Sequence, residues 1–231
     1  DDGTLAVNLM DCFVPGTPMI SPYIDRFVLS TIDDVGLNLQ GRQFWHSPTK
    51  LGNINWCAKH RIRPKNTVEQ ILLFSKTTHP NWDLNRMPRG EYAKRSSAQI
   101  ASDRRRGKAI RPSGYDINEH AFSRGKNGPL PGNLIIAGGA SGSDAYSRRC
   151  REQGIEAHPA RYPEELPRRI ICLTTEPGDI VYDPMAGSNT TGKVALELGR
   201  KFIASEPMLS YVMGSSLRFE DRPDFRRHFQ K

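Results

Sequence analysis

One stretch near the end of the 231-residue chain is the most informative about its fold: Val181-Tyr182-Asp183-Pro184-Met185-Ala186-Gly187-Ser188-Asn189-Thr190-Thr191-Gly192. It starts as an apolar strand, passes through a turn of small residues and enters a predicted helix. At such a junction, free backbone amides and small side chains let a polar or anionic ligand approach the chain. Three of its residues, Ser188, Asn189 and Thr190, are also good helix N-caps, so an ordinary capped turn explains the stretch equally well.

A second element supports the ligand-binding interpretation. The next apolar run, Lys201 to Ser205, is predicted to be a strand and ends at Glu206. Dinucleotide-type folds place a carboxylate at about this distance downstream, where it binds ribose hydroxyls. The chain contains neither G-x-x-x-x-G-K-[ST] nor G-x-G-x-x-G, which disfavours a P-loop nucleotidase and a nicotinamide or flavin enzyme.

Hydrophobic periodicity predicts alternating strands and helices on both sides of a long irregular region. Strands are expected at 3–9, 43–46, 70–76, 179–182 and 201–205, and helices at 23–35, 163–174, 190–198 and 209–219. Such alternation predicts an α/β fold with a parallel, doubly wound, Rossmann-like sheet.

Between about Thr77 and Ala145 the apolar periodicity fades, while Gly, Pro, Ser, Asn and basic residues multiply. Its apolar residues, Tyr92, Tyr115, Phe122 and 134–136, favour an ordered but irregular recognition insert over a disordered linker. We therefore expect one core built from 1–78 and 151–231, with a target-recognition insert at 79–150.

The composition is basic, with a formal charge of +8 and a pI near 9.5. This charge favours a polyanionic partner such as DNA. The four cysteines show no C-x-x-C spacing, so we expect reduced thiols in a cytoplasmic protein, with neither disulfides nor a metal site. No run approaches the ~18 apolar residues of a membrane span.

Two motifs carry a family resemblance. Residues 183–192 resemble the D-P-F-x-G-S-G-T-T cofactor loop of amino-group DNA methyltransferases, with Asn189 where most members have Gly. His158-Pro159-Ala160-Arg161-Tyr162-Pro163-Glu164-Glu165-Leu166-Pro167 resembles the H-P-A-x-[FY]-P-x-x-L-P segment that precedes that loop. Together with Phe74 to Thr77 and Arg111 to Ile117, they make the chain most similar to the cytosine-N4 enzymes.

The resemblance implies an S-adenosylmethionine-dependent methyltransferase fold that transfers methyl groups to exocyclic N4 of cytosine by base flipping, in a restriction-modification setting. The cofactor site would include Asp183, Pro184, Gly187, Ser188, Asn189 and Thr190, with Glu206 on the ribose and His158 at the methionine end. For His158, a role in orienting the next helix is an equal alternative to direct contact.

The catalytic residues remain unknown, because the family's S-P-P-Y or D-P-P-Y motif does not occur in the chain. Ser21-Pro22-Tyr23 has a single proline, and we expect Ser21 to cap the following helix with Pro22 in its first turn. By the family's motif order, the catalytic loop is expected upstream of Asp1 or on a partner chain.

The insert supplies the candidate DNA-binding residues: Arg104, Arg105, Arg106, Arg111, Ser113, Tyr115 and His120. Three alternatives stay open: an N6-adenine DNA methyltransferase, a DNA-binding or cofactor-binding subunit that is inactive without a partner, and an RNA or small-molecule methyltransferase. The sequence does not determine the oligomeric state.

Overall fold

The computed structural model describes residues 2–89, 129–139 and 142–226. Its elements run β1 (Thr4–Leu9), α1 (Tyr23–Asp33), β2 (Asn38–His46), the π-helix η1 (Ile54–Lys59), β3 (Val68–Ser75), the 3₁₀ helix η2 (Leu84–Arg86), β4 (Leu134–Ile136), α3 (Ala145–Glu152), α4 (Glu165–Thr174), β5 (Ile180–Asp183), α5 (Thr190–Glu197), β6 (Lys201–Ala204) and α6 (Leu209–Ser216). Contacts divide the chain into one unit of 1–86 and 132–231 and a second unit of 87–131.

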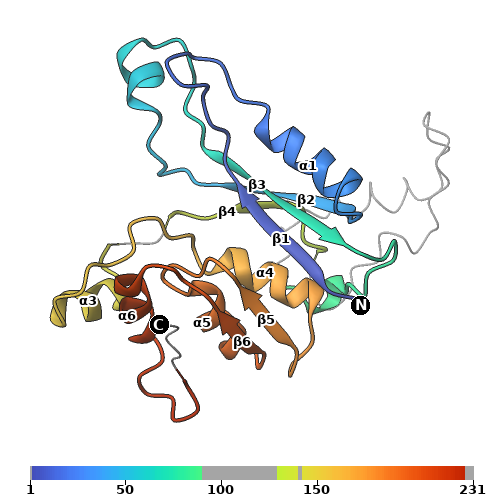
Figure 1. The fold of residues 1–231 in the computed structure, drawn as a ribbon, viewed down its shortest axis with the longest axis vertical. Coiled ribbons are helices and arrows are strands. Elements are labelled where there is room, and N and C mark those ends of the chain that lie inside the picture. The colour runs from blue at the N-terminus through green and yellow to red at the C-terminus, as the bar shows by residue number, and fades with distance from the viewer. Residues whose placement is uncertain (1, 90–128, 140–141, 227–231) are drawn as a thin grey trace, which may run out of the picture. The chain divides into compact units, whose positions relative to one another are not determined.

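Four strands form a sheet in the order β1-β3-β2-β4. The β1 and β2 strands run in the same direction and are joined by α1, as expected for a crossover unit. The α1 helix lies on the sheet (Figure 1). Its apolar face packs there, with Ile24 and Val28 in one buried cluster with Leu72 and Phe74. Burial of these side chains is the main stabilising contribution of this layer.

The expectation of an entirely parallel sheet is wrong for this half of the fold. The β3 strand lies between β1 and β2 and is antiparallel to both. Residues 47–67 return the chain to the start of β3, so its direction is opposite to that of β2. The four buried residues at 71–74 explain its central place, because both faces of the strand are covered.

The second sheet contains β5 and β6, which are parallel and joined by α5. Val194 and Ala195 of α5 are fully buried and pack with Ile171 of α4. Val181 and Phe202 contribute one apolar side chain from each strand. This βαβ unit agrees with the sequence expectation, and it places residues 184–189 at the carboxyl end of β5.

Regular elements occur in the described parts of the segment that was expected to be an irregular insert at 79–150. The β4 strand pairs in parallel with β2 through Phe44–Leu134, and α3 follows it. Trp45 is buried and its indole N–H donates to the Ala137 carbonyl at 2.9 Å, so this side chain packs the sheet. Arg86 is used structurally as well, in an ion pair with Glu176 at 3.0 Å.

The expected cap of α1 is wrong. The helix begins after Pro22, which is the N-cap, and no side chain caps it in the described structure. The backbone amide of Ser21 instead donates to the Cys12 carbonyl at 2.8 Å, which ties the start of the helix to the loop after β1. All four cysteines are free. No helix within the described ranges is long and apolar enough to cross a membrane.

Candidate cofactor site

The turn between β5 and α5 has the backbone geometry of a tight ligand-binding loop. Gly187 and Asn189 both adopt positive φ angles, +51° and +53°. Asn tolerates this left-handed conformation better than most residues, which explains an asparagine where relatives have glycine. Its side chain also accepts a hydrogen bond from the Gly192 amide at 3.0 Å, so Asn189 is the N-cap of α5.

Asp183 at the end of β5 holds the turn in place. One carboxylate oxygen accepts the Met185 amide at 3.1 Å, and the other accepts the Thr191 hydroxyl at 2.7 Å. The Tyr162 hydroxyl also donates to Asp183 at 3.4 Å. Burial, and then the charge of Asp183, raise the pKa of Tyr162. Asp183 therefore fixes the shape of the turn through hydrogen bonds within the protein.

Glu206 faces the turn from the end of β6. Its Oε2 atom accepts the Gly187 amide at 2.9 Å and its Oε1 atom accepts the Met208 amide at 3.0 Å. Each carboxylate oxygen has room for a second hydrogen bond, so the pair can still receive two hydroxyl protons from a vicinal diol. The half-buried side chain is thus aimed where a ribose-binding carboxylate has to be.

His158 lies over the turn. A Cβ atom added to Gly187 would come within 3.0 Å of the His158 Nε2 atom, so the ring and the glycine are in close contact. The ring also meets Tyr211 edge-on, with centroids 4.4 Å apart. Its Nδ1 atom is buried and has no hydrogen-bond partner among the described residues. Buried polar atoms are normally satisfied, so this nitrogen is a candidate ligand contact.

Only some of the free backbone amides expected at the turn are observed: those of Ser188, Thr190 and Thr191 form no hydrogen bond with the described residues, whereas others are used inside the protein. The amides of Ala186, Gly187 and Asn189 donate to the Ser205 carbonyl, to Glu206 and to the Ala186 carbonyl. The buried hydroxyls of Ser188 and Thr190 lie 3.1 Å apart and bond each other. Pro184 is exposed. The Glu206 carboxylate, the His158 ring and the remaining free amides at the start of α5 are therefore the groups available to a ligand here.

Arg218 also supports the turn, and nothing in the sequence pattern indicated it. Its Nε–H donates to the Ser188 carbonyl at 2.7 Å, and its guanidinium lies 4.3 Å from the centre of the Tyr146 ring. Burial lowers the pKa of Arg218. Tyr146 in turn accepts the His158 backbone amide at 3.2 Å, so one tyrosine links Arg218 to His158.

Arg161, from the histidine-proline motif, completes this support. It pairs with Asp144 at 2.5 Å and its guanidinium lies 5.2 Å from the Tyr146 ring centre. Burial alone would raise the pKa of Asp144, but hydrogen bonds from Ser147 and the charge and hydrogen bond of Arg161 lower it. The structure thus brings together the cofactor candidates at 158, 183–190 and 206. The DNA-binding candidates, Arg104, Arg105, Arg106, Arg111, Ser113, Tyr115 and His120, lie outside the described residues.

A βαβ unit whose glycine turn faces a carboxylate on the adjacent strand defines the class of the protein, a Rossmann-like nucleoside-binding fold. The chain belongs to the DNA methylase family that comprises N6 and N4 methyltransferases, because the model of this family matches residues 1–215. The resemblance inferred from the two motifs is therefore confirmed at the level of the family.

Two individual relatives are methyltransferases as well. The chain is 37% identical over 222 residues to the type II methyltransferase M.PvuII of Proteus hauseri, covering 95% of this chain and 66% of that protein. It is 54% identical over 57 residues to the DNA adenine methyltransferase YhdJ of Escherichia coli strain K12, covering 25% of this chain and 19% of the relative. The chain thus spans just under two thirds of the length of the first relative and about a fifth of the second.

Solved structures give the same fold. The structure of the PvuII DNA methyltransferase, described as cytosine-N4-specific, matches with a TM-score of 0.73 and 32% identity over 96% of this chain and 65% of that one. The M1.HpyAVI–SAM complex matches with a TM-score of 0.52 and 18% identity over 95% of this chain and 75% of that one, which concerns the fold alone.

Proposed function

We propose that the chain is the cofactor-binding and DNA-binding part of a methyltransferase that moves a methyl group from S-adenosylmethionine to the exocyclic N4 of cytosine in duplex DNA. The similarity to a cytosine-N4-specific enzyme over nearly the whole chain supports this target. The observation that carries the cofactor assignment is the Glu206 carboxylate bonded to the Gly187 amide at the mouth of the turn.

The residues present fit this cofactor. Glu206 has unused lone pairs for the two ribose hydroxyls and a negative charge that complements a sulfonium ion. The unpartnered Nδ1 atom of His158 offers a contact for a polar group, and the absence of a side chain at Gly187 lets the ring lie against the turn. In this proposal Asp183, Asn189, Ser188 and Thr190 shape the turn, and Pro184 ends the strand.

The cofactor, when bound, supplies an electrophilic methyl group on sulfur. Transfer of this methyl group would break the carbon–sulfur bond, form a carbon–nitrogen bond and release one proton from the amine. The residues that orient the amine and receive that proton are not assigned in this chain, since neither S-P-P-Y nor D-P-P-Y occurs in it. We propose that a segment outside these residues, or a partner chain, provides them.

DNA recognition is proposed for the insert, as expected from its arginines, with base flipping to expose the target amine. The excess of positive charge, +8, favours binding to the phosphate backbone. A cytoplasmic restriction-modification role is consistent with free cysteines and with the type II relatives.

An N6-adenine target is the alternative, favoured by the short but close similarity to the adenine methyltransferase YhdJ. Methylation of duplex DNA by the purified chain together with the segment or partner that carries the S-P-P-Y or D-P-P-Y loop, followed by mass spectrometry of the released nucleosides, separates the two. We expect N4-methyldeoxycytidine among the released nucleosides. N6-methyldeoxyadenosine would move the target to adenine, and cofactor binding by the chain alone without any methylated product would favour a subunit that depends on a partner.

A further inference from the structure

Basic side chains also gather outside the insert, in the connection from β2 to β3. Residues 47–67 contain five lysines and arginines and no acidic residue. Lys50 is paired with Glu69, but Lys59, Arg61, Arg63 and Lys65 are exposed and form no ion pair with the residues that the structure describes. We name residues 59–65 the basic segment. Four unneutralised charges within seven residues favour an anionic partner.

The basic segment has a defined conformation. The Asn53 side chain caps η1 by accepting the Trp56 amide at 3.0 Å, and the Trp56 carbonyl accepts the amides of Ile62 and Arg63 at 3.1 and 3.3 Å. A Cβ atom at Gly52 would come within 2.9 Å of the Lys65 side chain, so that side chain is packed against the glycine. Ordered cations lose less side-chain entropy on binding than free ones.

Arg61 has a strained backbone. Its φ angle is +55°, and within the described residues Asn189 of the cofactor turn is the other non-glycine residue with a positive φ. Arginine, unlike asparagine, has no short polar side chain to favour this conformation. Strain of this kind is concentrated at functional sites, where the surrounding structure holds it.

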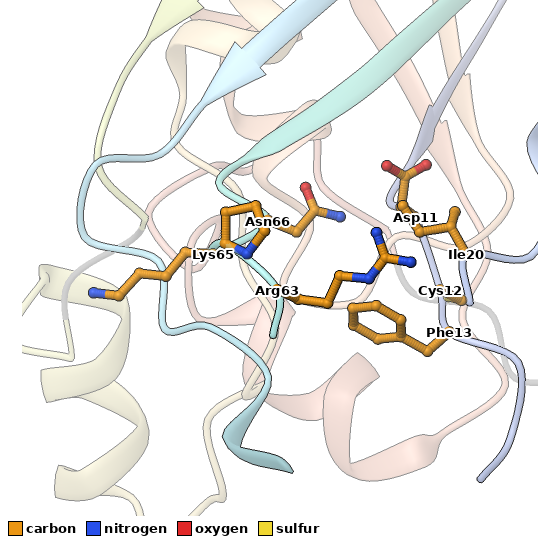
Figure 2. A pocket seen from close by; sticks show the side chains of 8 residues that line it. Asp11, Cys12, Phe13, Ile20, Arg63, Lys65 and Asn66 are labelled. Atoms are coloured by element: carbon orange, nitrogen blue, oxygen red, sulfur yellow. The ribbon is translucent and has the colours of Figure 1, made fainter. Parts of the chain in front are cut away.

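Arg63 is fixed at the edge of a small pocket. Its Nε–H donates to the Pro18 carbonyl at 2.8 Å, which leaves the four terminal N–H groups for another acceptor. A cavity of about 180 Å³ lies beside it, lined by Asp11, Cys12, Phe13, Ile20 and residues 63–66. Figure 2 shows the Arg63 side chain reaching toward Asp11 and Phe13, while Lys65 extends away from them.

This surface lies at the edge of the sheet where ligands bind in α/β folds. Because β1 and β3 are antiparallel with Leu9 opposite Gln70, the loop after β1 and the loop before β3 emerge at the same edge. That edge is the carboxyl end of β1 and β2, outside which open α/β sheets bind their ligands. Figure 1 shows η1 beside the loop that follows β1.

We infer that the basic segment contacts consecutive phosphates of the DNA backbone, with Arg61 and Arg63 as its main contacts, independently of the 87–131 unit. The inference rests on the proposed function in taking DNA as the partner. The Asp11 carboxylate in the pocket repels a phosphate, so the phosphates lie along the rim and not inside the cavity.

The test is the salt dependence of binding to a duplex of random sequence, measured by fluorescence anisotropy from 50 to 300 mM salt (a range set by the usual screening of phosphate contacts). The double variant Arg61→Ala/Arg63→Ala is compared with Arg148→Ala/Arg151→Ala, which removes the same charge from the exposed face of α3. We expect Arg61→Ala/Arg63→Ala to bind DNA on the order of tenfold more weakly at about 0.1 M salt. The slope of log affinity against log salt concentration should become smaller in magnitude by about 2. The α3 variant should keep the slope of the wild type.

S-adenosylmethionine binding by calorimetry, measured on the same variants, shows whether they remain folded; we expect both to retain wild-type affinity. Equal losses of DNA affinity in the two double variants would overturn the inference in favour of a net-charge effect. Wild-type affinity and slope in Arg61→Ala/Arg63→Ala would overturn it and leave the proposed function standing. Failure of the wild-type protein to bind duplex DNA at all would contradict the proposed function itself.

Discussion

The Gly187 amide donates to the Glu206 carboxylate at 2.9 Å, across the gap between the turn after β5 and the end of β6. This hydrogen bond joins the two sequence features that first indicated a nucleoside site. It fixes the direction of the carboxylate, and it leaves lone pairs on both oxygens for a ligand. The account of the cofactor site depends on it.

Gly187→Ala is expected to lower S-adenosylmethionine affinity at least tenfold. The added Cβ would lie 3.0 Å from His158 Nε2, and alanine disfavours a φ of +51° by roughly 1–2 kcal/mol. Gly36→Ala is the matched control, because Gly36 has a φ of +75° with open space around its Cβ position. Both variants should lose stability in thermal unfolding because of the positive φ angle, and Gly187→Ala should lose more because of the contact with His158, while only Gly187→Ala weakens binding in calorimetry. Equal cofactor affinities for the two variants would exclude the close contact with His158 as a requirement.

Arg218→Lys is expected to weaken cofactor binding several-fold while keeping the charge. Lysine cannot hold the Ser188 carbonyl and lie flat on Tyr146 at the same time, and a hydrogen bond and a cation–π contact are each worth about 1 kcal/mol. Arg222→Lys, at an exposed position, is the control. Chemical denaturation and a cofactor titration of both variants measure the effect. Wild-type behaviour of Arg218→Lys would show that the turn does not need this support.

The stability of the protein is expected to fall at alkaline pH, in part through Tyr162. Burial and Asp183 raise the pKa of this phenol, so it stays neutral in the folded state above the pH at which an unfolded tyrosine ionises, about 10. By proton linkage, the contribution of Tyr162 to the free energy of unfolding is fully present below that pH and is lost as pH rises toward the folded-state pKa. Tyr162→Phe should show a shallower loss of unfolding free energy above about pH 10. An unchanged pH profile for the variant would contradict the assignment.

The βαβ unit around the turn could be predicted from the sequence because its signals are local. The apolar strands, the small turn residues and the capping side chain of Asn189 all lie within a few residues of the elements that they determine. The histidine-proline motif likewise located His158 beside the turn. These elements and the family resemblance agree with the structure.

Features that depend on distant contacts could not be predicted in this way. The antiparallel course of β3 depends on the two strands between which it lies, and β4 is a three-residue strand that is defined by pairing with β2. The Arg218–Ser188 hydrogen bond joins residues 30 positions apart. Ser21 was a good cap by composition, but its backbone bond to Cys12 sets the start of α1 at Pro22.

The turn amides illustrate a different limit. A glycine-rich sequence indicates that the backbone can approach a ligand, but it does not reveal which amides are already bonded inside the protein. Asp183 accepts the Met185 amide and the Thr191 hydroxyl, so a substitution of Asp183 would disturb the turn as well as any ligand contact. Glu206 also holds the turn, but glutamine at position 206 keeps an acceptor for the Gly187 amide, so Glu206→Gln is the cleaner change.

Titration calorimetry of Glu206→Gln tests whether Glu206 binds the ribose of S-adenosylmethionine. Glutamine keeps the size and can still accept the Gly187 amide, but it loses the charge and one accepting oxygen. We expect the affinity to fall at least tenfold with little change in thermal stability, while Glu152→Gln, at an exposed position of α3, binds as the wild type does. Wild-type affinity in Glu206→Gln would contradict the assignment of this carboxylate and of the site built around it.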